Sequence, residues 1–157
     1  MTTVAWDGIS LASDSQSQTD NLICSTSEQK IYTPENGDRW AINDNEIVAI
    51  GTSGDCGAED ELIDKLRNGI NYNTEFSPLI EFYAIAIVCT EHAYLIYKNK
   101  DSTHASISKQ REPIAIGSGG VCARAAMQCG KNAIDAVEIA KSMDVYSGGE
   151  TQVFRVK

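Results

Sequence analysis

The start of the chain carries a residue that could act as a nucleophile. Met1 is followed by Thr2, and a small second residue of this kind permits removal of the initiator methionine. Thr2 would then hold a hydroxyl group and a free α-amine, whose ordinary pKa of about 7.7–8.0 leaves part of it neutral and basic at pH 7. The amine can accept the hydroxyl proton, usually through a water molecule, as in nucleophilic catalysis at an N-terminal threonine. Met-Thr-Thr is a common N-terminal sequence, so it indicates catalysis only in combination with other residues.

Asp14 and Lys30 form a second pair that could take part in chemistry. An ammonium group beside Thr2 would stabilise the alkoxide and lower the pKa of the α-amine, and the carboxylate of Asp14 would hold Lys30 charged and in place. The alternative is that Asp14 is a loop residue and Lys30 an exposed strand residue, in which case both are ordinary surface charges.

Two glycine-rich segments follow predicted strands and precede predicted helices: Gly51-Thr52-Ser53-Gly54-Asp55 and Gly117-Ser118-Gly119-Gly120. Backbone amides at such a junction can bind an anion or the oxyanion of a tetrahedral intermediate. A nucleotide site is disfavoured, because neither segment has the Lys-Ser/Thr pair of a P-loop or the full dinucleotide-binding pattern. The other interpretation of both segments is a tight turn between a strand and a helix.

A last polar segment, Asp144-Val145-Tyr146-Ser147-Gly148-Gly149, follows the final predicted helix. Its glycines are typical of a helix C-terminus. Asp144 and Ser147 are three residues apart and could also form a polar cluster close to a reactive amine.

These residues depend on a pattern of strands and helices that indicates an α+β layered domain. Asp7-Gly8 is a strong hairpin signal between the first two strands, and Asn132 caps the last helix. A short helix is predicted over 77–82, with Pro78 in its first turn. The segment 22–24 could form an additional short strand. The other predicted strands span 2–6, 9–13, 30–32, 40–42, 47–52, 84–89, 92–98, 114–117 and 152–156, and the longer helices span 55–68, 121–129 and 132–143.

The composition excludes several classes of protein. The 157 residues include 22 acidic and 13 basic side chains, a formal charge of −9, and such a surface repels nucleic acid. The longest apolar stretch, 83–89, is too short to span a bilayer, and the start lacks the basic region typical of a signal peptide. We therefore expect a cytoplasmic protein that binds neither nucleic acid nor membrane.

The cysteines and histidines limit the chemistry further. The 5 cysteines show no Cys-x-x-Cys spacing, which indicates free thiols in a reducing compartment and not disulfides or a zinc site. We expect no metal and no cofactor. A cysteine hydrolase that uses Cys122 is an alternative, but neither His92 nor His104 can be connected with it by sequence, and a small buried thiol is the simpler interpretation.

Taken in order, these segments resemble the proteasome β-subunit and HslV peptidase family of N-terminal nucleophile (Ntn) hydrolases. The matching features are the opening Thr-Thr-Val, Ala-Ser-Asp ending at Asp14, Lys30, and the segments 49–55, 114–120 and 144–149. The resemblance covers essentially the whole chain and so implies a single domain over 1–157. The fold it implies is a four-layer αββα sandwich, with two antiparallel sheets between helix layers.

The resemblance also implies a role for each matching residue. Thr2 is the nucleophile and its α-amine the general base, Lys30 promotes deprotonation, and Asp14 orients Lys30. The backbone amide of Gly51 binds the tetrahedral oxyanion. A hydrogen-bonding cluster around the Thr2 amine consists of Ser118, Asp144 and Ser147. Positions similar to the substrate cleft of the family are Ser17, Gln18, Glu28, Ala49 and Ser53.

The function implied by this resemblance is that of a threonine-type endopeptidase. It would form an acyl-enzyme on Thr2 inside a homo-oligomeric ring. Its substrates would be unfolded chains delivered by an ATP-dependent unfoldase. Glu28 could favour a basic side chain just before the scissile bond, or be an exposed residue at a strand edge. The alternative function is that of a catalytically inactive subunit, a ring scaffold or binding module, which would keep Met1 or misplace one catalytic residue.

The sequence departs from the family pattern in two places. The first hairpin is shorter than is usual, although Asp14 and Lys30 keep their spacing, and the segment 71–82 is too short for the long second helix that contributes to ring packing. HslV-like Gly-Ser-Gly-Gly and proteasome-like Ser-Gly-Gly occur together, so both branches of the family stay open. A small bacterial or virus-encoded relative would fit these features.

Overall fold

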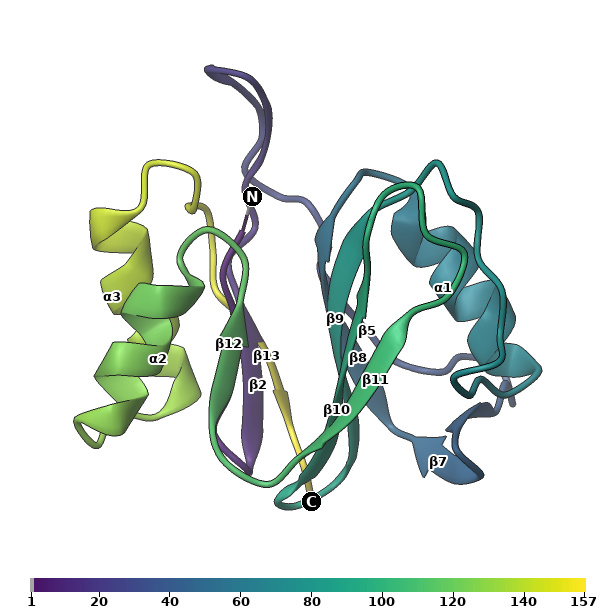
Figure 1. Cartoon of the computed structure of the whole chain (residues 1–157). Helices are drawn as coiled ribbons and strands as arrows, with labels where there is room; N and C mark the ends of the chain where they lie inside the picture. Colours follow the sequence, from purple (N-terminus) through teal and green to yellow (C-terminus); the bar gives the residue numbers. More distant parts are fainter. Residues whose placement is uncertain (1) are drawn as a thin grey trace.

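The computed structural model describes residues 2–157, which contain two antiparallel sheets that lie face to face (Figure 1). The first has the strand order β12-β1-β2-β13, with β1 (Val4–Trp6), β2 (Ser10–Ser13), β12 (Ile114–Ile116) and β13 (Gln152–Arg155). The second has the order β11-β10-β9-β8-β5, with β5 (Ile31–Tyr32), β8 (Ala49–Gly54), β9 (Phe82–Cys89), β10 (His92–Lys98) and β11 (Ser106–Gln110). Two separate hairpins are β3 (Ser17–Thr19) with β4 (Leu22–Ser25), and β6 (Trp40–Ile42) with β7 (Asn45–Ile47).

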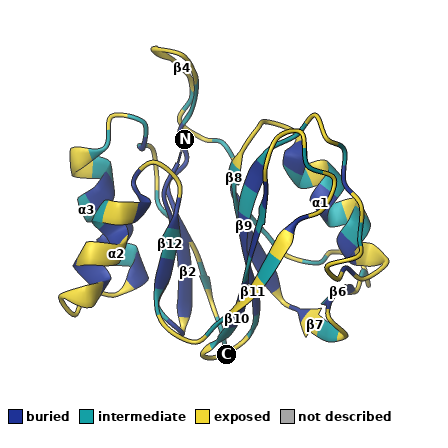
Figure 2. Cartoon of the chain, viewed as in Figure 1, coloured by how far each residue is buried: buried dark blue, intermediate teal, exposed yellow. Residues whose placement is uncertain are grey.

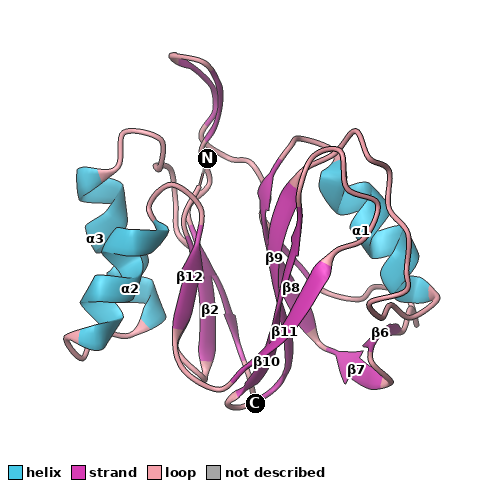
Figure 3. Cartoon of the chain, in the orientation of Figure 1, coloured by secondary structure: helices cyan, strands magenta, loops and turns pink. Residues whose placement is uncertain are grey.

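The helices lie on the outer faces of the two sheets (Figure 3). The helices α2 (Gly120–Gln128) and α3 (Ala133–Met143) cover the first sheet, and α1 (Ala58–Arg67) covers the second. The chain is therefore a mixed α/β structure with antiparallel sheets. None of the helices within 2–157 combines the length and the apolar character needed to cross a bilayer.

Three apolar clusters hold these layers together, and the most buried residues lie along the sheets (Figure 2). Because the side-chain period of a strand is two, strands such as β1, β2, β8 and β9 contribute side chains to two clusters. Toward the second sheet β1 presents Val4 and Trp6, which pack with Ile85 and Ile87 of β9. Toward the helices the first sheet presents small residues, Ala5 among them, so that α2 and α3 can approach closely. The cluster between α1 and the second sheet includes Ile50, Leu62, Leu66 and Ala84.

The structure confirms the signals at the two ends of the chain. Gly8, with φ 102°, forms the turn between β1 and β2, and Asp7 Oδ1 accepts a hydrogen bond from the Ser10 amide at 2.7 Å. Asn132 caps α3 by accepting from the Asp135 amide at 2.8 Å. Both signals are local turn and cap chemistry, which explains why sequence alone predicts them.

The middle of the chain differs from the prediction. The helix predicted over 77–82 is wrong: a turn at 78–79 leads directly into β9. Long-range contacts hold this turn, because the Asp101 amide donates to Pro78 O at 2.8 Å and Lys98 Nζ donates to Ile80 O. We predict from the turn at 43–45 that the strands over 40–42 and 47–52 pair; in the structure β6 pairs with β7, which ends at Ile47, and β8 lies between β5 and β9. The strand β11 has no counterpart among the predicted strands.

Candidate active site

Thr2, Asp14 and Lys30 meet at one end of the sheets. The Thr2 hydroxyl donates to Asp14 Oδ1 at 2.6 Å and accepts a hydrogen bond from Lys30 Nζ. Lys30 Nζ also donates to Asp14 Oδ1 at 2.7 Å and to Gln16 O at 2.5 Å. Thr2, Asp14 and Lys30 are 2%, 0% and 6% exposed, so the alternative of two ordinary surface charges is wrong.

The strand register explains how three residues so far apart in the chain come together. Val4 of β1 lies opposite Ser13 of β2, so Asp14 follows directly beside the N-terminus, and its amide donates to Thr3 O at 3.1 Å. Lys30 immediately precedes β5, at the end of the second sheet that faces the same region. Antiparallel pairing in each sheet therefore brings the carboxylate and the ammonium to Thr2.

The Asp14 carboxylate is satisfied entirely by protein donors. Besides Thr2 and Lys30, Oδ1 accepts from the Thr3 amide at 3.1 Å, and Oδ2 accepts from the Gln16 amide at 3.2 Å and the Gly148 amide at 3.0 Å. Burial lowers the pKa of Lys30 below its ordinary value, although the charge and hydrogen bond of Asp14 oppose the shift. A more acidic ammonium donates a stronger hydrogen bond to negative charge that develops on the Thr2 oxygen.

A second polar cluster surrounds the Thr2 nitrogen. Thr2 N donates to Ser118 Oγ at 3.2 Å, Ser118 Oγ donates to Asp144 Oδ2 at 2.6 Å, and Ser147 Oγ donates to the same oxygen at 2.7 Å. Burial opposes ionisation of Asp144, but the hydrogen bonds from Ser118, Ser147 and the Tyr146 amide outweigh it, so the pKa of Asp144 lies below its ordinary value. The structure thus joins all three residues predicted for this cluster by hydrogen bonds, and the cluster reaches the Thr2 nitrogen through Ser118.

Two glycines between β12 and α2 allow this close approach. Gly117 has φ 93°, and a side chain there would collide with the carbonyl of Thr2. A side chain at Gly119 would collide with Thr3 Oγ1. The Gly-Ser-Gly-Gly segment is therefore more than a tight turn, because its lack of side chains admits the N-terminal residues.

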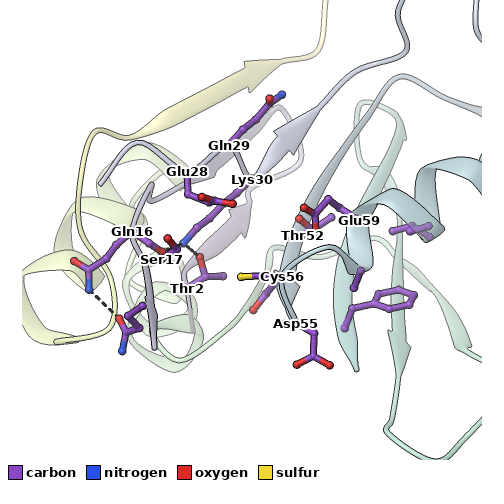
Figure 4. A pocket seen from close by; sticks show the side chains of 16 residues that line it. Thr2, Gln16, Ser17, Glu28, Gln29, Lys30, Thr52, Asp55, Cys56 and Glu59 are labelled. Atoms are coloured by element: carbon purple, nitrogen blue, oxygen red, sulfur yellow. Dashed lines mark hydrogen bonds between the residues drawn. The ribbon is translucent and has the colours of Figure 1, made fainter. Parts of the chain in front are cut away.

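A cavity opens beside Thr2 and Lys30 (Figure 4). Four of the five residues predicted for the substrate cleft line it: Ser17, Gln18, Glu28 and Ser53. The fifth, Ala49, is not brought to the cavity. It is fully buried between the two sheets, in the cluster that contains Val4 and Ile87.

Gly51 also lies away from the cavity. It is buried inside β8, and a side chain there would meet Val4 Cγ1 at 2.6 Å. The Thr52 amide donates to Lys30 O at 2.9 Å, so the alternation of a strand directs the Gly51 amide toward β9, where Gly51 lies opposite Ile85. The residues that line the cavity instead are the next ones along β8, from Thr52 to Gly54.

Sequence analysis missed several residues at this site. Glu59 and Cys56 line the cavity from the start of α1 and the loop before it. Gln152 of β13 braces the backbone near the centre: its Oε1 accepts from the Lys30 amide at 3.0 Å, and its Nε2 donates to Ser15 Oγ at 2.9 Å and to Glu28 O at 2.6 Å. No motif marks Gln152, whereas the position of Glu59 in the first turn of a predicted helix after the glycine-rich segment was a usable signal. The described residues contain no group of three or more His, Cys, Asp or Glu side chains placed to hold a metal ion.

Comparisons with known proteins show similarity in structure alone. No family model matches the sequence, and no curated protein matches it. Thiobacillus denitrificans BPH is similar in two structures: its complex with epoxomicin (TM-score 0.63, 14% identity, covering 99% of this chain and 98% of that one) and BPH alone (0.65, 16%, 99% and 98%). The helical assembly of the Anbu complex from Pseudomonas aeruginosa is also similar (0.61, 10%, 99% and 80%). The chain therefore shares the fold of these structures.

Proposed function

We propose that this chain is a threonine-type endopeptidase that hydrolyses peptide bonds through an acyl-enzyme on Thr2, once Met1 has been removed. The observation that carries the proposal is the placement of the Thr2 hydroxyl, which is buried between Lys30 and Asp14 at the wall of a cavity. The proposal includes the whole of 1–157 as one domain, with the face-to-face sheets and their outer helices as a four-layer αββα sandwich.

In the proposed reaction the free α-amine of Thr2 accepts the hydroxyl proton through a water molecule, and Oγ1 attacks the peptide carbonyl carbon. The C–N bond breaks as the Oγ1 ester forms, and the amine passes its proton to the leaving nitrogen. Water then hydrolyses the ester and restores the hydroxyl. Lys30 stabilises charge on Oγ1, Asp14 holds Lys30, and Ser118 orients the amine within hydrogen-bonding reach.

The oxyanion of the tetrahedral intermediate needs a hydrogen bond from a backbone amide that faces the cavity. The sequence candidate was Gly51, but the direction of its amide in β8 favours a residue that shares the orientation of Thr52. Gly54 is two residues further along the strand and lines the cavity. We therefore assign the oxyanion contact to the Gly54 amide as part of the same proposal.

Assembly is a further part of the proposed function. A structurally similar protein, the Anbu complex, forms a helical assembly, which supports self-association of this chain in a homo-oligomeric ring or an open variant of one. An ATP-dependent unfoldase would deliver substrates to it. Light scattering coupled to size-exclusion chromatography tests self-association: a mass near 17.0 kDa at micromolar concentration contradicts it.

The experiment that tests the chemistry is the intact mass of the purified protein, before and after exposure to a peptide vinyl sulfone. We expect loss of Met1 and an adduct that peptide mapping places on Thr2. Thr2→Ala removes that adduct and leaves any adducts on cysteine thiols, and Thr90→Ala, in an exposed turn, is the matched control that keeps it. Retained Met1 with no adduct on Thr2 contradicts the proposal and favours a scaffold or binding module.

A further inference from the structure

The cavity beside Thr2 carries three carboxylates on its wall. Asp55 is exposed, and its Oδ2 accepts from the Glu81 amide at 2.9 Å, so the other two, Glu28 and Glu59, are the candidates for contact with a ligand. Glu28 lies just before β5 and Glu59 in the first turn of α1, and both are half-buried (Figure 4). Neither forms a salt bridge within residues 2–157, and one Glu59 oxygen accepts from the Gly57 amide at 3.1 Å. The cation that lines the cavity with them, Lys30, is already bound to Asp14 at 2.7 Å. The cavity therefore has an excess of negative charge that no protein group neutralises.

The charges of Glu28 and Glu59 contribute to the electrostatic potential of the same region. Burial first, and then the charges of Glu59 and Glu28, raise the pKa of Tyr32 to about 12, which places the two side chains within electrostatic reach of one hydroxyl. Glu28 also acts on Lys30, on the Thr2 side of the cavity. The negative potential consequently extends from the candidate nucleophile to α1.

Part of the remaining lining, on the α1 side of the cavity, is apolar. Ala58, Leu62 and Phe82 line the same cavity and are 2%, 0% and 1% exposed. A side chain that combines an aliphatic stem with a cationic end satisfies both parts, because the stem packs against apolar atoms while the charge meets the carboxylates. A carboxylate side chain would meet like charge, and a short apolar one would leave both carboxylates unpaired.

We propose that this cavity selects a lysine or arginine side chain at the residue whose carbonyl carbon Thr2 attacks, with Glu28 and Glu59 as the specificity-determining residues. The inference rests on the proposed function and adds the substrate class to it. The residue that presents its carbonyl to Thr2 Oγ1 has its side chain next to Thr2, and Thr2 is itself part of the cavity wall.

The test compares three vinyl sulfones that differ only in the residue next to the reactive group: lysine, its uncharged analogue norleucine, and glutamate. The rate of adduct formation on Thr2 is expected to be at least about tenfold higher for lysine than for norleucine, and lowest for glutamate. Glu28→Gln and Glu59→Gln each lower the ratio of the lysine rate to the norleucine rate about threefold to fivefold, the effect of a partly exposed ion pair. Glu112→Gln, an exposed glutamate outside the cavity, is the matched control.

A second measurement does not depend on catalysis. Cys56 lines the cavity, so a bound peptide shields it from iodoacetamide, while the exposed Cys129 reports general reactivity. In the Thr2→Ala variant, a peptide amide that ends in lysine is expected to slow alkylation of Cys56 more than one that ends in norleucine. Equal rates for lysine and norleucine on Thr2, or equal protection of Cys56, overturn the specificity. No adduct on Thr2 together with lysine-dependent protection of Cys56 overturns the proposed chemistry and keeps the charge preference of the cavity.

Discussion

Replacing Asp14 with asparagine removes the one carboxylate that faces the Lys30 ammonium. The side chains of Asp14 and Lys30 are 0% and 8% exposed, so water cannot take the place of the lost partner. Removing one member of a buried ion pair typically costs about 3–5 kcal/mol, because the other charge stays buried without compensation. We expect Asp14→Asn to lower the free energy of unfolding by about that amount near pH 6.

The loss is expected to depend on pH. Burial already lowers the pKa of Lys30, and Asp14 is the first of the groups that oppose the shift, so the pKa falls further when Asp14 is replaced. Between this lowered folded value and the ordinary 10.5 of the unfolded chain, the folded state binds fewer protons, and its stability therefore rises with pH. The deficit of Asp14→Asn relative to the wild type is largest at low pH and shrinks as Lys30 loses its proton.

The assay is urea unfolding followed by circular dichroism, from pH 6 to pH 9, on Asp14→Asn, Lys30→Met and the double variant. The double variant should be more stable than the sum of the two single losses predicts, by about 2 kcal/mol or more, since it leaves no unpaired charge. Asp20→Asn, at an exposed position, is the control and should change stability by less than about 0.5 kcal/mol. Additive losses that do not vary with pH would refute the reasoning.

Two further predictions concern the residues around the Thr2 nitrogen. Gly117→Ala should lower the free energy of unfolding by several kcal/mol and abolish labelling of Thr2, because the added side chain collides with the Thr2 carbonyl. Gly130 has the same φ of 93° but open space around it, so Gly130→Ala should lower stability by about 1 kcal/mol and leave the labelling normal. Equal losses of stability from both glycine variants would contradict the collision. Asp144→Asn should cost about 1–2 kcal/mol near pH 7. The pKa of Asp144 is lowered in the folded state, so its contribution to stability is present above the ordinary pKa of 3.8 and is lost as the pH falls through the folded value. Urea unfolding from pH 7 to pH 3 checks that the stability difference between Asp144→Asn and the wild type disappears at low pH.

Part of the polar cluster around Thr2 was predictable from sequence because its members lie next to strong local signals. Asp7-Gly8 predicts the hairpin that brings Asp14 beside the N-terminus, and the glycines at 117 and 119 predict a junction that can approach it closely. Ser118 then follows from its place in that junction. Each of these positions depends on the few residues around it.

The lining of the cavity was less predictable, because it depends on the face of β8 and on the position along it that each residue occupies. Ala49 and Gly51 were placed at the site by their segment, yet both face the interior between the sheets. A shift of one residue along a strand moves every side chain and amide to the opposite side, and a sequence motif does not specify that register. Thr52, Ser53 and Gly54, at the end of the same strand, line the cavity. Because Ser53 shares the alternation of Gly51, the position along β8 decides the lining as well as the face.

The order of residue types along the chain was enough to predict a layered α+β protein, since turns, caps and hydrophobic periodicity are properties of neighbouring residues. A common site for Thr2, Asp14 and Lys30 followed from the family resemblance of the ordered segments and not from these local signals. Only the tertiary structure decided that Glu28 and Glu59 share one cavity and that Gln152 braces the backbone of Lys30. Those contacts join segments separated by tens of residues. Their geometry follows from sheet register and helix packing, which depend on the whole chain and not on any one segment of it.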